Sequence, residues 1–173
     1  DGSVRLLDFG IAKAVTQTHI SEAGTVKGKF AYLAPEQVEG LPLDKRVDVY
    51  SAGLVLYELL TGKQANGGGG GQGSLLQTLQ GNIKPVRELR PEIPLPLAGI
   101  IDKALSRDRE ERYQAASQME AALELFLTRI GRPVLAQDVC AFLKSIEEAT
   151  GEPLSLVDRA NAVVAETAEA VPA

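Results

Sequence analysis

The sequence predicts a mainly α-helical fold with one short pair of extended segments near the N-terminus. Apolar residues recur at helical spacing in several stretches of the chain, whereas only two short runs near the start are typical of strands. At 173 residues and 45% hydrophobic content, the chain is long enough to form one packed core. The predicted helical stretches are residues 44–61, 97–105, 119–130 and 135–146.

The first forty residues predict short elements around a polar loop. Residues 4–7 form a strand candidate, and residues 11–15 are a second extended candidate. Residues 16–29 are polar, rich in small side chains and without period, which favours a mobile loop. Residues 35–40 then fit a single helical turn that starts at a proline.

The longest predicted helix covers residues 44–61. Asp44 is placed as its N-cap and Gly62 as its C-terminal stop. Between Val47 and Leu60 the only charged residues are Asp48 and Glu58. A helix that is apolar nearly all round is expected to be buried on most sides.

Residues 66–130 predict linkers and two amphipathic helices. Residues 66–73 form a glycine run that favours a flexible connection, and residues 74–80 begin with a capping box that favours a short helix. The four prolines of residues 85–96 indicate an extended linker. The predicted core stripes are Leu97, Ile100, Ile101, Ala104 and Leu105, then Met119, Ala122, Leu123, Phe126 and Ile130.

Charge indicates a boundary near residue 132. Residues 1–132 hold 16 acidic and 16 basic side chains, whereas residues 133–173 hold seven acidic and two basic ones, so the net charge of −5 belongs to the tail. Within that tail, residues 135–146 carry an apolar helical stripe and residues 155–168 a weaker one. Neither part has the basic stripe that phosphate backbones require, so we expect no nucleic-acid partner.

Composition excludes several further classes. The longest apolar run, residues 54–60, is interrupted by Glu58 and is far too short to span a bilayer. Cys140 is the only cysteine and His19 the only histidine, so the chain offers no internal disulfide and no zinc-ligand set. We therefore expect a cytoplasmic protein without a membrane segment.

Four motifs stand in a fixed order along the chain. The triplet Asp8-Phe9-Gly10 directly follows the first strand candidate, and Ala34-Pro35-Glu36 closes the stretch that begins at Gly28. Asp48-Val49-Tyr50-Ser51-Ala52-Gly53 opens the long apolar helix. The polar stretch Arg107-Asp108-Arg109-Glu110-Glu111-Arg112-Tyr113 separates the two amphipathic helices.

In this order and rough spacing the motifs resemble those of a bacterial serine/threonine protein kinase of the eukaryotic-like type. The resemblance implies that residues 1–131 are the helical C-lobe, with an activation segment at residues 8–36 and a glycine-rich loop at 66–73. Residues 132–173 would be an acidic helical C-terminal extension. The N-lobe and the catalytic loop are expected upstream of Asp1, so we expect a fragment of a longer kinase.

The function that this resemblance implies is ATP-dependent transfer of a γ-phosphate to serine or threonine hydroxyls of a protein substrate, with ATP and Mg²⁺ as cofactors. No catalytic residue is expected in this chain, because the base would lie upstream of Asp1, and the 173 residues alone are predicted to be inactive. One alternative is a non-catalytic, kinase-like scaffold or binding module. Another is a split kinase completed by a second polypeptide.

The first motif carries the cofactor prediction. In the resembling family an aspartate at the position of Asp8 holds the metal that bridges the phosphate oxygens. Phe9 would then be a packing residue and Gly10 a backbone pivot. The alternative is that Asp8 caps a tight turn ahead of Gly10.

Three further residues have structural roles in the family. Glu36 and Arg112 would form a buried ion pair that clamps the end of the activation segment; the alternative is two solvated side chains. Asp48 would hold backbone amides of the catalytic loop. Equally, Asp48 could be a simple first-turn acid that favours the helix dipole.

The activation segment contains four candidate phosphosites, Thr16, Thr18, Ser21 and Thr25, of which we rank Thr25 first. A phosphate there would order the loop by pairing with an arginine, whereas the simpler alternative is solvated loop residues. Lys29 departs from the family pattern, because serine/threonine kinases usually have threonine at this position. An ammonium group cannot accept the hydrogen bond that a hydroxyl would.

Overall fold

The computed structural model describes residues 29–66, 78–131 and 134–151. The chain divides into two compact units, one covering Asp8–Gly131 and the other combining Asp1–Leu7 with Arg132–Ala173. Every regular element among the described residues is a helix, which confirms the mainly α-helical prediction. The strand candidates at residues 4–7 and 11–15 lie outside the described residues.

Two short elements come first among the described residues. The 3₁₀ helix η2 covers Lys29–Tyr32, and α1 covers Pro35–Val38. Proline suits the first position of α1, because its missing N–H would have no partner there. The side-chain oxygen of Gln37 accepts the N–H of Ala34 at 2.9 Å and so caps the start of this helix.

The long helix α2 covers Arg46–Thr61, so the predicted start at Asp44 was wrong by two residues. Lys45 is the N-cap, and the Asp44 carboxylate accepts the backbone N–H of Arg46 at 2.9 Å from outside the helix. An aspartate readily bonds the backbone two residues on, which forms a turn before the helix starts. Gly62 ends α2 with a left-handed φ of 67°.

One face of α2 is buried and the opposite face is open in the described part of the chain. Val55 is 47% exposed and Leu59 is 77% exposed, so the predicted burial on most sides holds for the rest of the helix but not along this face. Asp48 and Ala52 are also exposed and follow the same helical spacing. The buried positions are Val49, Tyr50, Gly53, Leu54, Tyr57 and Thr61.

The proline-rich stretch is partly helical, which corrects the prediction of an extended linker over residues 85–96. Helix α4 covers Val86–Leu89, directly after Pro85, and α5 covers Leu95–Ala104 with proline in its first turn. Prolines at these positions remove no helical hydrogen bond. Burial of the Val86 side chain fixes α4 against the core.

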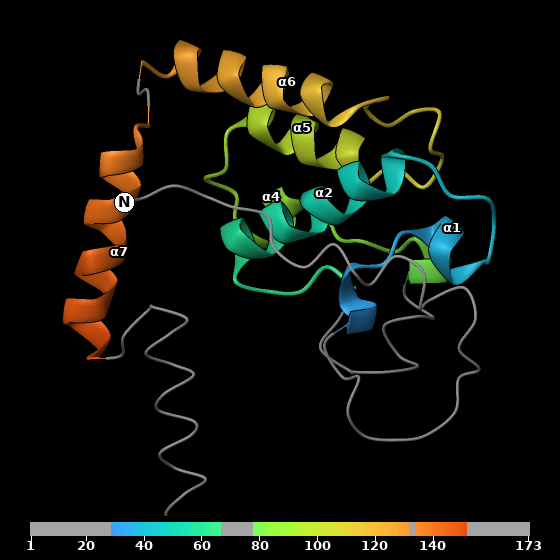
Figure 1. Ribbon diagram of the computed structural model, residues 1–173, viewed down its shortest axis with the longest axis horizontal. Coiled ribbons are helices and arrows are strands. Elements are labelled where there is room, and N and C mark those ends of the chain that lie inside the picture. The colour runs from blue at the N-terminus through green and yellow to red at the C-terminus, as the bar shows by residue number, and fades with distance from the viewer. Residues whose placement is uncertain (1–28, 67–77, 132–133, 152–173) are drawn as a thin grey trace, which may run out of the picture. The chain divides into compact units, whose positions relative to one another are not determined.

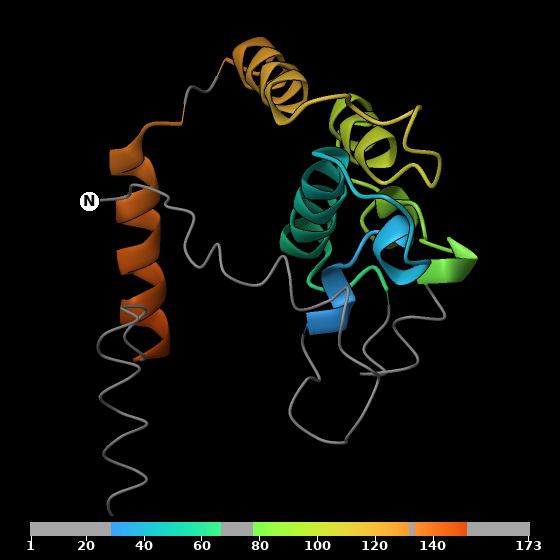
Figure 2. The ribbon, with the colours of Figure 1, turned by 45° about the vertical axis from the view of Figure 1, so that its right-hand side comes forward.

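Helix α6 covers Ala116–Arg129 and completes the packing of this unit. Figure 1 shows α5 between α6 and α2, and the view in Figure 2 shows the same three helices from another side. The predicted stripe of α6 packs inward from Met119 to Phe126, whereas Ile130 is exposed. Gly131 follows in a left-handed conformation that ends the helix.

The crossing of α2 and α5 depends on a missing side chain. A Cβ atom at Gly53 would lie 3.0 Å from Cβ of Ala104 and 3.0 Å from Cδ2 of Leu105. These distances are shorter than an ordinary carbon–carbon contact, so a methyl group would force the helices apart. Glycine at residue 53 therefore permits the close packing of the two helices.

Helix α2 contributes to each hydrophobic cluster found among the described residues of this unit. Fully burying one large aliphatic side chain contributes about 1.5–3 kcal/mol, so these clusters are the main source of stability. The buried members are Val49, Ile100, Ala104, Tyr113 and Met119 in the first cluster, Tyr57, Val86, Ile93, Ala98 and Ile101 in the second, and Ala34, Tyr50 and Leu54 in the third.

Helix α7 covers Ala136–Thr150 and belongs to the second unit. The Asp138 carboxylate accepts the N–H of Leu135 at 2.8 Å and caps its start. None of its residues is buried, and its apolar stripe includes the exposed Phe142 and Leu143. Among all helices of the described ranges, none has the length and apolar character needed to cross a bilayer.

Candidate functional site

A buried ion pair joins α1 to the loop between α5 and α6. Nη1 of Arg112 lies 2.7 Å from Oε1 of Glu36, and Nη2 lies 2.9 Å from Oε2. The two residues are 76 positions apart in sequence, and both are buried. Two parallel N–H···O bonds to a carboxylate form the geometry in which arginine binds most specifically.

The remaining donors of Arg112 bind backbone carbonyls. Nε donates to Ser106 at 2.7 Å, Nη2 to Arg107 at 3.1 Å and Nη1 to Arg46 at 3.4 Å. The guanidinium also lies over the ring of Tyr50, 4.7 Å from its centre. Arg112 thus holds α1, the start of α2 and its own loop together.

Electrostatics at this pair follow from burial and from the neighbouring arginines. Burial alone would raise the pKa of Glu36, but the hydrogen bond from Arg112 and the charges of Arg112 and Arg109 hold that pKa below its usual value. Burial raises the pKa of Tyr50 to about 12. Glu36 is therefore ionised, and Tyr50 neutral, at neutral pH.

A second arginine network lies at the surface beside the buried pair. Nη2 of Arg46 lies 2.8 Å from Oδ2 of Asp44, and Nη1 lies 2.9 Å from Oε2 of Glu110. Nη1 also donates to the side chain of Gln114 at 2.8 Å. Hydrogen bonds from Arg46 lower the pKa of Asp44 to about 2.

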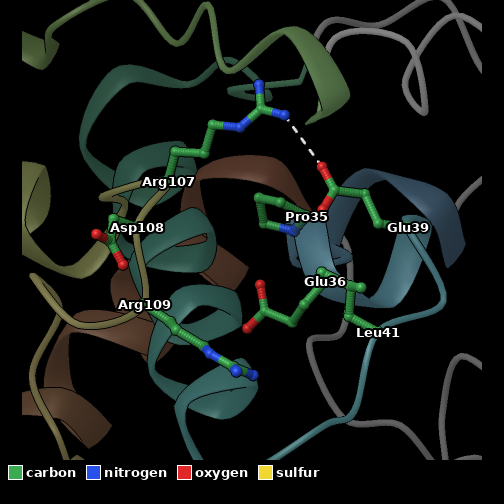
Figure 3. A pocket seen from close by; sticks show the side chains of 7 residues that line it. All are labelled: Pro35, Glu36, Glu39, Leu41, Arg107, Asp108 and Arg109. Atoms are coloured by element: carbon green, nitrogen blue, oxygen red, sulfur yellow. Dashed lines mark hydrogen bonds and ion pairs between the residues drawn. The ribbon is translucent and has the colours of Figure 1, made fainter.

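A shallow pocket of about 170 Å³ separates α1 from the loop that follows α5. Figure 3 shows Arg107 reaching across it to Glu39, with Nη2 of Arg107 3.0 Å from Oε1 of Glu39. Glu36 points a different way from the same short segment. Three carboxylates and two guanidinium groups line the opening, which gives it a formal net charge of −1. The lining residues are Pro35, Glu36, Glu39, Leu41, Arg107, Asp108 and Arg109.

Side chains from α2 and beyond fix η2. The hydroxyl of Ser51 donates to the carbonyl of Tyr32 at 2.9 Å, and the hydroxyl of Tyr32 donates to Oε2 of Glu58 at 2.5 Å. The hydrogen bond to Glu58 raises the pKa of Tyr32. The side-chain amide of Asn66 donates to the carbonyl of Ala31 at 3.0 Å.

The sequence analysis did not predict these contacts of Ser51, Glu58 and Asn66 with η2. One signal was present, because Glu58 is a lone carboxylate near the end of an apolar helix and therefore needs a partner. Ser51 and Asn66 carried no comparable signal. Both act over long sequence distances, on carbonyl groups whose lack of partners is visible only in the fold.

The predicted site residues have different outcomes. The structure brings Glu36 and Arg112 together, and it places Asp48 in the first turn of α2 with its side chain exposed. Lys29 is the first residue of η2. The other predicted site residues, Asp8, Phe9, Gly10, Thr16, Thr18, Ser21 and Thr25, lie outside the described residues.

The described residues offer no cluster of metal-ligating side chains. Residues 29–66, 78–131 and 134–151 contain no group of three histidine, cysteine, aspartate or glutamate side chains arranged to hold a metal ion. Asp8, the predicted metal ligand, precedes these ranges. The described site is a buried ion pair beside a pocket of about 170 Å³.

Residues 1–123 match the protein kinase domain family, so the chain belongs to that family. The prediction of a kinase C-lobe fragment is thereby confirmed.

Three relatives are informative. The tyrosine-protein kinase MasK of Myxococcus xanthus is 42% identical over 143 residues, covering 83% of this chain and 22% of the relative. The probable serine/threonine-protein kinase PknB of Lactococcus lactis is 33% identical over 159 residues, covering 91% and 25%. The serine/threonine-protein kinase PrkC of Bacillus subtilis is 37% identical over 123 residues, covering 71% and 19%. The chain thus spans about a quarter or less of the length of these relatives.

Proposed function

We propose that this chain is the C-lobe, with a C-terminal extension, of an ATP-dependent protein kinase that phosphorylates serine or threonine hydroxyls. The observation that carries the proposal is the buried, bidentate pair of Glu36 and Arg112 inside a chain that matches the kinase family. Two relatives named serine/threonine-protein kinases support the substrate class. ATP and Mg²⁺ would be the cofactors and a protein the substrate.

The role of the pair in this function is positional. Phosphoryl transfer requires groups held in fixed places rather than covalent help from the protein. Glu36 ends the predicted activation segment, and Arg112 ties that end to the loop after α5 and to the start of α2. The pair would therefore keep the end of residues 8–36 in one position during turnover.

Asp8 would hold the metal in the complete kinase. A bound Mg²⁺ supplies charge neutralisation for the phosphate oxygens, and a carboxylate oxygen is a suitable ligand for it. Phe9 and Gly10 would provide packing and a pivot beside it. Thr25 is our first candidate for an activating phosphosite in the same segment.

The open face of α2 supports the proposal that the 173 residues alone are inactive. Asp48, Val55 and Leu59 share this exposed face, which combines one carboxylate with two large apolar side chains. An apolar stripe on a helix whose other face forms the core favours a covering segment. We infer that the catalytic loop and its surroundings cover this face in the complete kinase, with Asp48 bound to backbone amides.

The proposed organisation has a kinase C-lobe at residues 1–131 and an acidic helical extension at 132–173, in a cytoplasmic protein. The charge difference between the two parts supports the boundary. The exposed apolar stripe of α7 also supports a separate extension, because none of the residues of α7 is buried.

A second substrate class has one specific observation in its favour. The relative that is 42% identical is named a tyrosine-protein kinase, and Lys29 replaces the threonine expected in serine/threonine kinases. Tyrosine as the acceptor is therefore the competing proposal. The hydroxyl that receives the phosphate distinguishes the two.

The test is phosphoamino-acid analysis of a protein substrate after incubation with labelled ATP. We expect the complete kinase that contains this chain to yield phosphoserine or phosphothreonine, an Asp8→Asn variant to lose that activity, and the 173-residue chain alone to transfer no phosphate. Phosphotyrosine alone would support the competing class. No transfer by the intact wild-type kinase would favour a non-catalytic scaffold, and turnover by the short chain would refute its predicted inactivity.

A further inference from the structure

The end of η2 leaves two carbonyl groups that the local sequence cannot satisfy. In a 3₁₀ helix each carbonyl bonds the N–H three residues later. For Ala31 that N–H belongs to Ala34, which donates instead to the side chain of Gln37 at 2.9 Å. For Tyr32 the residue three positions later is Pro35, which has no N–H.

Long-range side chains satisfy both carbonyls. Ser51, on α2, donates its hydroxyl to Tyr32, and Asn66, beyond the end of α2, donates its amide to Ala31 at 3.0 Å. Asn66 is 0% exposed, and Ala31 is also buried. A buried backbone carbonyl requires a hydrogen-bond partner. Because solvent does not reach the Ala31 carbonyl, the amide of Asn66 takes the place that a water molecule would have at the surface.

The geometry around Asn66 favours a dedicated role over general packing. Its second polar atom, Oδ1, is buried and has no hydrogen-bond partner among the residues that the structure describes. A buried acceptor without a partner destabilises the fold, and an apolar side chain of similar size would avoid that penalty. Asparagine at this site is therefore explained by the bond that its amide makes to Ala31.

We propose that Asn66 is a positioning residue that fixes the end of the activation segment, residues 29–34, against α2. This inference rests on the proposed kinase function, because the ordering of the activation segment controls whether a kinase is competent. The amide of Asn66 locks the backbone at Ala31 immediately before the Ala34-Pro35-Glu36 triplet. Loss of that donor loosens the segment without touching the Glu36–Arg112 clamp.

The first test is hydrogen exchange, measured by mass spectrometry on the 173-residue chain without nucleotide. We expect Asn66→Leu to accelerate amide exchange in residues 29–34 by about fivefold, the factor that corresponds to losing one hydrogen bond of average strength. Exchange within α5 should stay unchanged. Lys63→Ala, a change of an exposed side chain in the same stretch, is the matched control and should change neither. Unchanged exchange at residues 29–34 in Asn66→Leu would overturn the proposal, as would equal acceleration throughout α5.

A measurement on the unmodified chain covers the case in which Asn66→Leu does not fold. Solution NMR should show slowly exchanging Asn66 side-chain amide protons with cross-relaxation to Ala31. Fast exchange with solvent and no such contact would contradict the proposed bond.

Activity in the complete kinase separates the two levels of inference. We expect Asn66→Leu to raise the KM for a protein substrate by about fivefold, matching the loss of one such bond, with the KM for ATP unchanged. An unchanged KM for the protein substrate would overturn the positioning role. If the wild-type complete kinase transfers no phosphate, the proposed function fails, while the exchange experiment still decides whether Asn66 orders residues 29–34.

Discussion

Two arginines, Arg112 in the loop after α5 and Arg46 at the start of α2, make ion pairs of nearly equal length in opposite surroundings. The Arg112–Glu36 pair spans 2.7 Å with side chains 0% and 6% exposed, whereas the Arg46–Asp44 pair spans 2.8 Å with side chains 12% and 41% exposed. Distance therefore does not distinguish them. Solvent access does, because water screens the outer pair and the protein must satisfy every donor of the inner one.

The difference shows in how each guanidinium is bound. Arg112 has a buried carboxylate, three backbone carbonyls and the face of Tyr50 as partners. Arg46 has partners that water could replace, including a Glu110 side chain that is 68% exposed. The inner pair specifies one arrangement of three chain segments, and the outer pair adds local support.

The largest effect is expected when the inner pair loses one partner. Arg112→Met leaves the Glu36 carboxylate buried and uncompensated, so we expect it to lower the free energy of unfolding by about 3–5 kcal/mol. Urea denaturation of the 173-residue chain, followed by circular dichroism, measures this loss.

The double variant Glu36→Met/Arg112→Met is the matched control for that experiment. It removes both charges together and should recover much of the stability lost in the single variant. A double variant that is as unstable as Arg112→Met alone would mean that lost packing, rather than a stranded charge, causes the effect.

An intermediate effect is expected from acid. The pKa of Glu36 in the folded chain lies below its usual 4.5, so the stabilisation is complete above pH 4.5 and is lost as pH falls through the lower, folded value. Unfolding free energies measured from pH 6 to pH 3 should therefore decline at the acid end. The double methionine variant should decline less steeply, and an identical slope in both proteins would exclude Glu36 as the source.

The smallest effect is expected at the outer pair. Asp44→Asn keeps the oxygen that accepts the Arg46 backbone N–H and removes only the charge. Exposed ion pairs contribute about 0–1 kcal/mol and are screened by salt. We expect a loss within that range in dilute buffer, and none in 1 M NaCl, by thermal or urea unfolding. A loss comparable to that of Arg112→Met would erase the distinction between the two pairs.

Local patterns predicted most of the helices and less of their ends. The apolar periods around Ile101 and Met119 required helices that bury one face, and the left-handed Gly62 ended α2 as expected. The predictions for the start of α2 and for residues 86–89, which form α4, were wrong. In the first case Asp44 forms its own turn, and in the second the burial of Val86 outweighs the preference of prolines for extended chain.

The candidate site was predictable where both partners of a contact belong to motifs of the family. Glu36 and Arg112 each belong to a recognisable motif, and the structure puts their side chains within hydrogen-bond distance; their role in the kinase stays a prediction. The partners of η2 were not predictable. Ser51 and Asn66 are selected by the position of two unsatisfied carbonyls, and that position exists only after α2 and η2 have packed.

The contribution of α2 to all three hydrophobic clusters has a mechanical consequence. A sliding or rotation of α2 that relieves strain in one cluster misaligns the other two, and Gly53 leaves no slack at the crossing with α5. A displacement of α2 would therefore be resisted at once by η2, α4, α5 and α6, the elements that it contacts.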